Sequence, residues 1–212
     1  MKTAVSRGVR FNLTGGKFTG AFEVNDGFYS GHYLGTEGSI TLAPDSNTSW
    51  QFVYVAPNSQ APGNWTSSIA NKRLYNFMYT ATRGKWLLQP YVLLVQSPQS
   101  KALGYTASES AYGLVFMSTY TINPTWSVAG RIEDIANRSP ITDASPNADL
   151  VGYGPGSGAW TFTLTPKFQR KQLFIRSDLS QVSARATSRA EALGPFDELS
   201  RRRDRLKEDL TA

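Results

Sequence analysis

The feature of this sequence that most constrains its fold is an alternation of apolar and polar residues with a period of two. The alternation is plainest in WTFTLTPKF (160–168), where large apolar side chains alternate with threonine and lysine, and it recurs in WSVAGRIE (126–133) and WQFVYV (50–55). Successive side chains of a β-strand point to opposite faces, so this period indicates strands whose two faces meet different surroundings. The chain is therefore predicted to be all-β.

Ten such segments follow one another along the chain, and several reach the roughly 9 to 11 residues that a tilted strand needs to cross a bilayer. Short turns alternate with long polar connections, which is the plan of an antiparallel up-and-down transmembrane β-barrel. Pro90 and Pro166 each remove a ladder donor, so we expect a bulge or an unpaired position at both. The predicted strands are residues 7–14, 17–25, 36–43, 48–56, 72–81, 85–97, 110–121, 125–136, 158–168 and 171–180, and the long connections are 27–35, 57–71, 97–108 and 137–158.

The composition excludes several other classes of protein. Cysteine is absent from the 212 residues, which excludes a disulfide framework, thiolate catalysis and cysteine-bound metal. The net charge is +6, but the basic residues near the end of the chain are mixed with acidic ones and the others are scattered singly without a basic stripe, so we expect no nucleic-acid partner. No apolar run approaches the roughly 20 residues of a membrane-spanning helix, and the first residues lack the apolar core of a signal peptide.

The last segment, 183–212, departs from the alternation. It combines helical spacing with mixed charge, including three consecutive arginines at 201–203. We therefore divide the chain into a β-barrel domain, residues 1–182, and a charged tail, residues 183–212, that is predicted to be helical or disordered.

Several runs carry a resemblance to a known family. In PTWSVAGRIEDIANRSP and SGAWTFTLTPKFQRKQLFIRSDLS the relevant patterns are Arg131–Asp134, Thr163–Pro166 and Arg176–Asp178, and SRGVRFNLTGGKFTGAFEVNDGFYSG and GSITLAPDSNTSWQFVYV extend the likeness to residues 6–182. These runs resemble the OmpL-like β-barrel porins, the β-barrel porin-2 family. The resemblance implies a pore in the outer membrane of a Gram-negative bacterium and names no solute. The aromatic closing strand usual in such barrels is replaced here by the charged tail.

Charged residues on the polar strand faces are the candidate functional residues. In a barrel they would line the pore, where rings of charge set ion preference. The alternative interpretation is a network of arginine–carboxylate pairs that fills the interior. Because their signs are mixed, no strong selectivity between anions and cations is predicted. These residues are Arg131, Glu133, Lys167, Arg176 and Asp178.

The residues that could suggest an active site have simpler explanations. Glu133 and Asp134 are adjacent in a strand and face opposite ways, which is unsuited to shared acid–base chemistry. His32 is the only histidine, so a metal site would lack a second imidazole, and Ser157 lacks the strand–turn–helix setting of a nucleophile. We expect a protein that is not an enzyme and that uses no metal or cofactor.

The large apolar side chains are predicted to point outward to lipid, because a protein in water rarely exposes so large an apolar surface. Trp50, Trp86, Trp126 and Trp160 are each expected beside a short turn, in an interfacial aromatic girdle. The residues predicted to face outward are Tyr75, Phe77, Tyr112, Leu114, Phe116, Val128, Ile132, Phe162, Leu164 and Ile175.

The leading hypothesis is passive diffusion of small polar solutes or ions through a water-filled barrel surrounded by outer-membrane lipid, alone or as a homo-oligomer. The alternatives are a non-conducting outer-membrane barrel with a structural or adhesive role and a soluble β-sandwich that acts as a binding module. Unpaired backbone groups are costly in lipid, so either residues 7–14 pair with 171–180 or the native protein supplies more strands. We expect the second arrangement.

Overall fold

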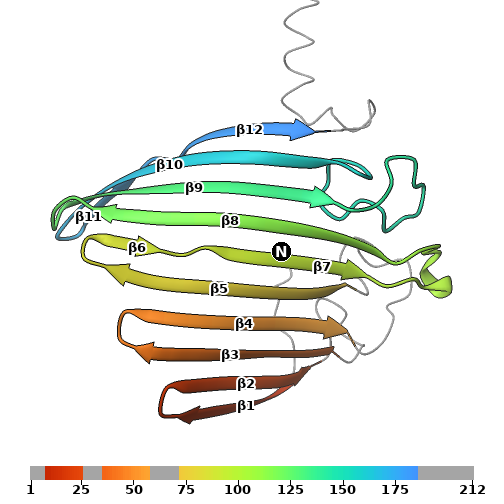
Figure 1. The fold of residues 1–212 in the computed structure, drawn as a ribbon, viewed down its shortest axis with the longest axis horizontal. Coiled ribbons are helices and arrows are strands. Elements are labelled where there is room, and N and C mark those ends of the chain that lie inside the picture. The colour runs from red at the N-terminus through yellow and green to blue at the C-terminus, as the bar shows by residue number, and fades with distance from the viewer. Residues whose placement is uncertain (1–7, 26–34, 58–71, 186–212) are drawn as a thin grey trace, which may run out of the picture.

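The computed structural model of the chain describes residues 8–25, 35–57 and 72–185. These residues form one antiparallel sheet in which successive strands are neighbours, so the predicted all-β, up-and-down fold is confirmed (Figure 1). The elements are β1 (Gly8–Gly15), β2 (Phe18–Asn25), β3 (Gly35–Asp45), β4 (Thr48–Pro57), β5 (Arg73–Arg83), β6 (Trp86–Leu88), β7 (Tyr91–Ser97), the 3₁₀ turn η1 (Lys101–Leu103), β8 (Glu109–Thr121), β9 (Trp126–Asn137), β10 (Gly158–Arg170), β11 (Leu173–Arg176) and β12 (Leu179–Arg185).

All ten predicted segments are strands, and one of them is interrupted at Pro90. β6 and β7, on either side of this proline, keep a single register against β5. The Tyr79 N–H donates to the Pro90 carbonyl at 3.0 Å, and Pro90 has no N–H to return the bond. The predicted unpaired position is therefore confirmed, whereas the alternative of a bulge is wrong.

Pro166 interrupts the strand across from it. It lies opposite Ser177, in the gap between β11 and β12, and its carbonyl accepts a bond from the Ser177 N–H at 3.3 Å that it cannot return. β11 and β12 nevertheless keep a single register against β10. β12 continues to Arg185, three residues beyond the predicted end of the barrel segment at residue 182.

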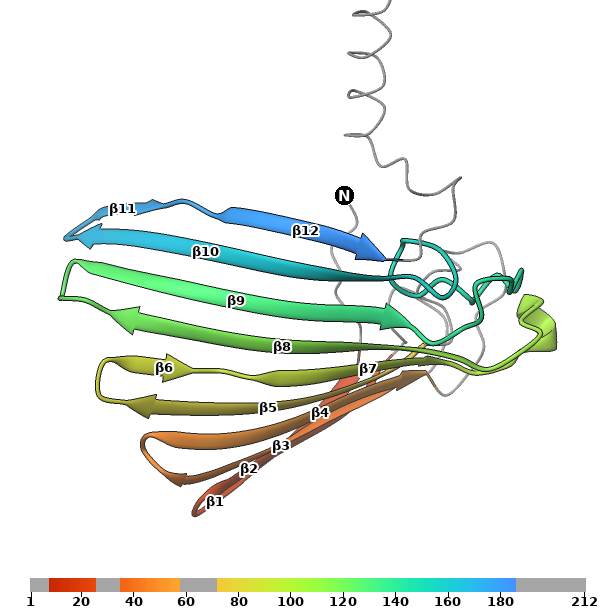
Figure 2. The same ribbon diagram turned by 45° about the horizontal axis from the view of Figure 1, so that its top comes forward.

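The connections alternate in length as predicted. Two-residue turns join β1 to β2, β3 to β4, β5 to β6 and β10 to β11, and positive φ angles of 56°, 59° and 52° occur at Gly16, Gly84 and Lys171. The long connections lie at the opposite end of the sheet (Figure 2). His32 and most of the first two long connections fall outside the described residues. The described part of the chain contains no helix with the length and apolar character of a membrane crossing.

In a soluble protein the apolar face of a sheet is usually buried and the polar face exposed. In this sheet the apolar side chains are the more exposed ones. On β10 Phe162 is 51% exposed, whereas its neighbour Thr163, which faces the other way, is 8% exposed. We call the face of Phe162 the apolar face and that of Thr163 the polar face. Cross-strand register confirms that the residues predicted to point outward share the apolar face: Tyr75, Phe77, Tyr112, Leu114, Phe116, Val128, Ile132, Phe162, Leu164 and Ile175.

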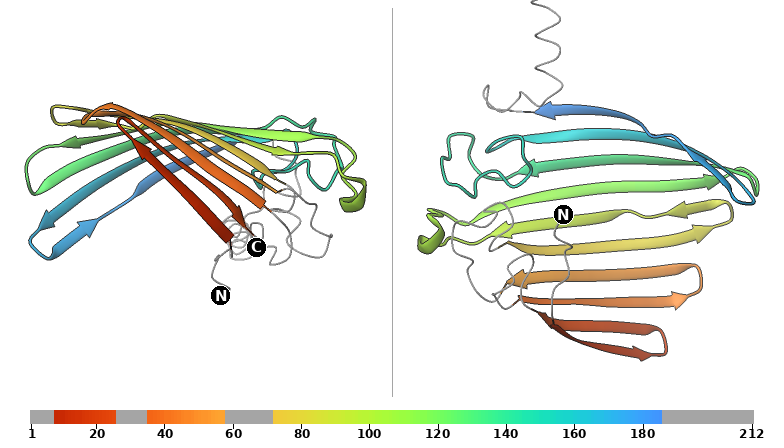
Figure 3. Two further views of the ribbon diagram at one scale, coloured as in Figure 1. Left: turned by 90° about the horizontal axis from the view of Figure 1, so that it is seen from below. Right: turned by 180° about the vertical axis from the view of Figure 1, so that it is seen from behind.

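The sheet is curved into an open trough. In the left view of Figure 3 the strands of both edges lie on the same side of the middle strands. Side chains converge on the concave side of a curved sheet, and most of the buried side chains on the strands, such as Val115 at 5% and Thr163 at 8%, belong to the polar face. The polar face is therefore concave. Within residues 8–25, 35–57 and 72–185, β1 pairs only with β2, and β11 and β12 pair only with β10.

Candidate functional site

The structure places all five predicted site residues on the polar face, in two groups. The first group is Arg131 and Glu133, two residues apart on β9. Their side chains meet with Arg131 Nη2 at 3.3 Å from Glu133 Oε2. Each lies opposite a threonine of β10, Thr163 and Thr161 respectively. The alternation of the sequence predicted that both residues lie on the polar strand face, and they do.

The second group lies near the short-turn end of β10 and β11. Arg176 binds Asp178 with Nη2 at 2.7 Å from Oδ2, and the Thr165 hydroxyl donates to Asp178 Oδ1 at 2.6 Å. Lys167 lies directly opposite Arg176, and its ammonium group is 5.5 Å from the centre of the Phe174 ring. This group has two cations against one carboxylate, so a positive charge remains uncompensated on this part of the wall. That these five residues line a pore stays a prediction.

A third charged group on the polar face was missed by the sequence analysis. Arg10 Nη1 lies 3.7 Å from Glu23 Oε2, and the Asn25 amide donates to Glu23 Oε1 at 3.2 Å. Glu37 lies directly opposite Glu23 on the next strand. The signal was present in the sequence, because Arg10 and Glu23 occupy polar positions of two alternating segments joined by a tight turn. The polar face is thus acidic near β2 and β3 and basic near β10 and β11.

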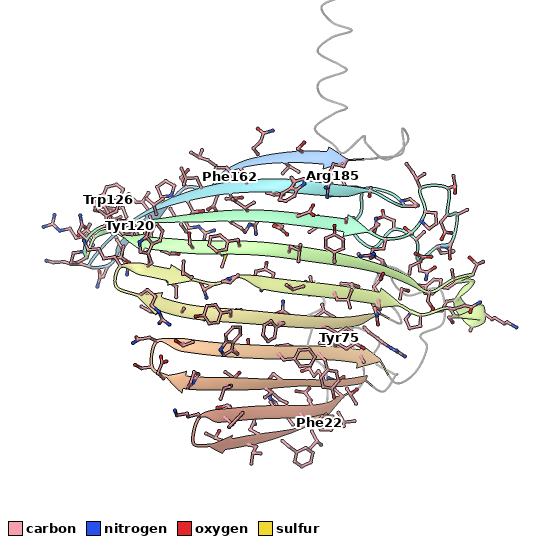
Figure 4. The ribbon with its side chains drawn as sticks, viewed as in Figure 1. Phe22, Tyr75, Tyr120, Trp126, Phe162 and Arg185 are labelled. Carbon is pink, nitrogen blue, oxygen red and sulfur yellow. The ribbon has the colours of Figure 1, made fainter. Side chains whose placement is uncertain are left out.

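The apolar face carries one buried carboxylate. Asp134 is only 7% exposed, and its register with Leu114 and Trp160 places it among lipid-type side chains. The Arg185 guanidinium forms an ion pair with it, and the Tyr112 hydroxyl donates to Asp134 Oδ2 at 3.4 Å. Figure 4 shows Arg185 at the long-loop end of β12, two strands away from Asp134.

A glycine gives the Arg185 side chain its path across β10. Gly158 lies directly opposite Arg185, and a Cβ atom on it would come within 3.0 Å of Arg185 Nη2 and 2.6 Å of the Ile135 carbonyl oxygen. The guanidinium also lies over the Trp160 ring, 5.6 Å from its centre. The ion pair therefore ties β12 to β9 across β10, and it gives the buried Asp134 carboxylate a counter-charge on the apolar face.

Aromatic pairs gather at the short-turn end of the apolar face. The ring centres are 4.3 Å apart for Trp50 and Tyr79, 4.7 Å for Trp86 and Tyr120, and 5.0 Å for Trp126 and Phe168. Figure 4 labels Tyr120 and Trp126 at this end. The pairs form the girdle predicted for three of the four tryptophans.

The prediction for the fourth tryptophan is wrong. Trp160 is the third residue of β10, which follows the long connection of residues 138–157, so it lies toward the opposite end of the sheet from the other three. The reason is that neighbouring strands run in opposite directions. Some strands therefore start at the short-turn end of the sheet and others, such as β10, start at the long-loop end.

The two described long connections are packed against each other at the long-loop end. Asn147, 2% exposed, donates from one connection to the carbonyls of Ser97 at 3.2 Å and Ala107 at 3.0 Å. The Thr106 N–H donates to the Ser145 hydroxyl at 3.2 Å. These bonds hold the β7–β8 and β9–β10 connections as one ordered rim.

Asp149 organises the second of these connections. Burial alone would raise the pKa of Asp149, but hydrogen bonds from the Asn137 side chain and from the backbone of Gly152, Gly154 and Val151 outweigh it, so the pKa lies below its usual 3.8. The Asn137 amide reaches Asp149 Oδ1 at 3.0 Å and the Gly154 carbonyl at 2.7 Å. The rim is therefore built around an ionised carboxylate.

Among the described residues no three histidine, cysteine, aspartate or glutamate side chains come together in a way that could hold a metal ion. Three carboxylates of the polar face, Glu23, Glu133 and Asp178, are instead engaged with arginine, threonine and asparagine side chains.

A family model described as "putative beta-barrel porin-2, OmpL-like" matches residues 2–201. The chain belongs to this family. Its membership confirms the resemblance carried by the strand motifs, and it identifies the protein as an outer-membrane protein of the β-barrel porin class. No curated protein and no solved structure matches the chain.

The sheet of this OmpL-like chain has the features that such a protein requires. Its exposed face is apolar and carries aromatic pairs at the short-turn end, and its concave face is polar and charged. A lipid exterior and a hydrated interior would suit these two faces respectively. The porin class is one of channels rather than enzymes.

Proposed function

We propose that this protein is a channel for passive diffusion of small polar solutes or ions across the outer membrane of a Gram-negative bacterium. The polar face forms the wall of the water-filled lumen, and Arg131, Glu133, Lys167, Arg176 and Asp178 are among its charged residues. The ordered rim of the two long connections stands at one mouth.

The observation that carries the proposal is the reversed exposure of the two faces. Phe116, Ile132 and Phe162 are direct cross-strand neighbours, and each is about half exposed, at 50%, 47% and 51%. In water such a contiguous apolar surface would drive aggregation, whereas in a bilayer it is the favourable arrangement. A soluble sandwich would instead bury these side chains between two sheets.

The charges of the polar face support conduction by a hydrated wall. The arginine and carboxylate side chains of the two ion pairs, Arg131–Glu133 and Arg176–Asp178, are 20% to 55% exposed, so they are not sealed into a dry core. Charges that remain accessible in this way interact with ions passing through a lumen.

The test is reconstitution of the purified chain in planar lipid bilayers. Stepwise conductance with a reproducible unit size is expected. Lys167→Glu should shift the reversal potential in a salt gradient toward cations, because it converts the basic region near β10 and β11 into an acidic one. Lys17→Glu, the same charge change in the β1–β2 turn, is the matched control and should shift it much less. Folded, membrane-inserted protein without conductance would favour the non-conducting barrel instead.

A further inference from the structure

The short-turn end of the sheet carries an excess of positive charge. Among the described residues that lie in a short turn or within three residues of one, five are cationic and only Asp45 is acidic. The described long connections, counted in the same way, have four cations and five carboxylates. Of the two ends, therefore, only the short-turn end has more cations than carboxylates.

We call the five residues the turn cations: Lys17, Arg83, Lys85, Arg170 and Lys171. The three lysines lie in the turns themselves, whereas the register of Arg83 with Trp86 and of Arg170 with Leu173 places both arginines on the apolar face. All five are exposed, and no carboxylate of the described residues forms an ion pair with any of them. None of them belongs to the polar face.

The hydrogen bonds of the turn cations leave their charge uncompensated. Arg83 donates to the Thr82 carbonyl at 2.9 Å and to the Thr48 hydroxyl at 3.1 Å, and Lys85 Nζ donates to the Ile122 carbonyl at 3.1 Å. All three acceptors are neutral. Because an arginine has five N–H donors and a lysine has three, both side chains keep donors for an anion.

The turn cations are neighbours of the aromatic girdle. Arg83 is the cross-strand partner of Trp86, and Arg170 lies two residues after Phe168, whose ring centre is 5.0 Å from that of Trp126. A turn lysine follows each of these arginines within two residues. Aromatic girdles lie at the level of the lipid head groups, and the apolar stems of lysine and arginine can lie along an apolar surface while their charges reach that level.

We infer that the turn cations bind the head groups of anionic phospholipids in the leaflet that surrounds the short-turn end. The short turns of outer-membrane barrels face the periplasm, so this is the periplasmic leaflet. A basic side chain near an anionic membrane surface gives a preference of about fivefold for the anionic lipid. The inference goes beyond conduction, because it requires only the membrane setting, and a barrel that does not conduct would bind the same lipids.

A soluble acidic partner in the periplasm is the alternative occupant, and two observations favour lipid. Arg83 and Arg170 lie on the apolar face, beside the girdle, rather than on the polar face. The turn cations are also spread from the β1–β2 turn to the β10–β11 turn, along the left edge of Figure 1, instead of forming one patch. A surrounding leaflet contacts all of these turns at once.

Tryptophan fluorescence can test the inference, because lipids with brominated chains quench the tryptophans that they contact. A reporter chain with Trp65→Phe and Trp160→Phe keeps Trp50, Trp86 and Trp126, and the structure places these three at the short-turn end. It is folded in vesicles of phosphatidylcholine and phosphatidylglycerol in equal amounts, with either one lipid or the other brominated. Stronger quenching by brominated phosphatidylglycerol at low salt measures its enrichment around these tryptophans.

An enrichment of about fivefold is expected if each head group meets one cation, and it should disappear at about 1 M salt. It should also disappear when the four turn cations beside the girdle are neutralised, in Arg83→Gln, Lys85→Gln, Arg170→Gln, Lys171→Gln. The matched control removes the same charge from the four cations of the long connections, in Lys72→Gln, Arg73→Gln, Lys101→Gln, Arg138→Gln, and should keep the enrichment.

Heat-modifiable migration shows that each variant has folded. If the fourfold variant does not fold, Arg170→Gln, Lys171→Gln replaces it, and this pair should lose part of the enrichment. Equal quenching by the two lipids at low salt, or an enrichment that survives neutralisation, overturns the inference. Binding of soluble polyglutamate to a protein without lipid preference would assign the turn cations to an acidic periplasmic partner. Neither result uses conductance, so failure of the channel and failure of this inference are distinguishable.

Discussion

Phe162→Arg should separate the two faces of the sheet most sharply. Phe162 lies on the apolar face between Ile132 and Gln181 and is 51% exposed. If this exposure is to lipid, an arginine near the bilayer midplane costs about 2 to 4 kcal/mol. That corresponds to a loss of about 30- to 900-fold in the folding equilibrium. If the exposure were to water, the same change would cost far less.

The matched control is Thr161→Arg, one residue earlier on the same strand and on the opposite face. Thr161 lies opposite Glu133, which can pair with the new guanidinium, so the expected cost is within about 1 kcal/mol. Thr163 is a poorer control because it is 8% exposed and its hydroxyl lies 2.8 Å from that of Ser180. Urea titration of folding into phospholipid vesicles, followed by heat-modifiable gel migration, gives both free energies. Equal costs for the two variants would refute the assignment of faces.

Three further outcomes follow from the structure. Arg185→Met should destabilise the folded protein by about 1 to 3 kcal/mol, because it leaves the Asp134 carboxylate on the apolar face without its counter-charge. This range allows for the partial exposure of Arg185, which weakens the ion pair. The double variant Arg185→Met, Asp134→Leu should recover most of the lost stability in the same urea titration. Asn147→Ala should cost the rim about 1 to 3 kcal/mol by removing the side-chain hydrogen bonds to the carbonyls of Ser97 and Ala107, seen as faster amide hydrogen exchange in residues 98–108 and 138–157 but not in β8 or β9. Because the folded pKa of Asp149 is lowered, its contribution to stability is present above pH 3.8 and is lost as the pH falls through the folded pKa. The protection factors of amides in 138–157, which correct for the intrinsic pH dependence of exchange, should fall over that range in the native protein and show no such fall in Asp149→Asn.

The strands were predictable because one physical rule applies at every residue of a two-faced sheet. Alternation in residues 126–133 and 160–168 placed Arg131, Glu133 and Lys167 on one face and Ile132 and Phe162 on the other, as the structure does. The interruptions at Pro90 and opposite Pro166 followed from the missing N–H. These properties depend on neighbours in sequence or on the adjacent strand.

Features that depend on register across several strands were not predictable. The ion pair of Asp134 and Arg185 joins residues 51 positions apart through the space left at Gly158, and the alternation alone marks Asp134 only as out of place on an apolar face. The rim contacts of Asn147 reach 50 residues along the chain to Ser97, and nothing in the local sequence specifies that carbonyl.

The most direct test of the central claim, that the polar face meets water and the apolar face meets lipid, is a scan of single cysteines along β10 from residues 160 to 165. Each variant is folded in lipid vesicles, labelled with a nitroxide and measured by electron paramagnetic resonance with a water-soluble and a lipid-soluble relaxant. Labels at Trp160, Phe162 and Leu164 should respond to the lipid-soluble relaxant, and labels at Thr161, Thr163 and Thr165 to the water-soluble one. Accessibility without this period of two, or with its sense reversed, would contradict the account.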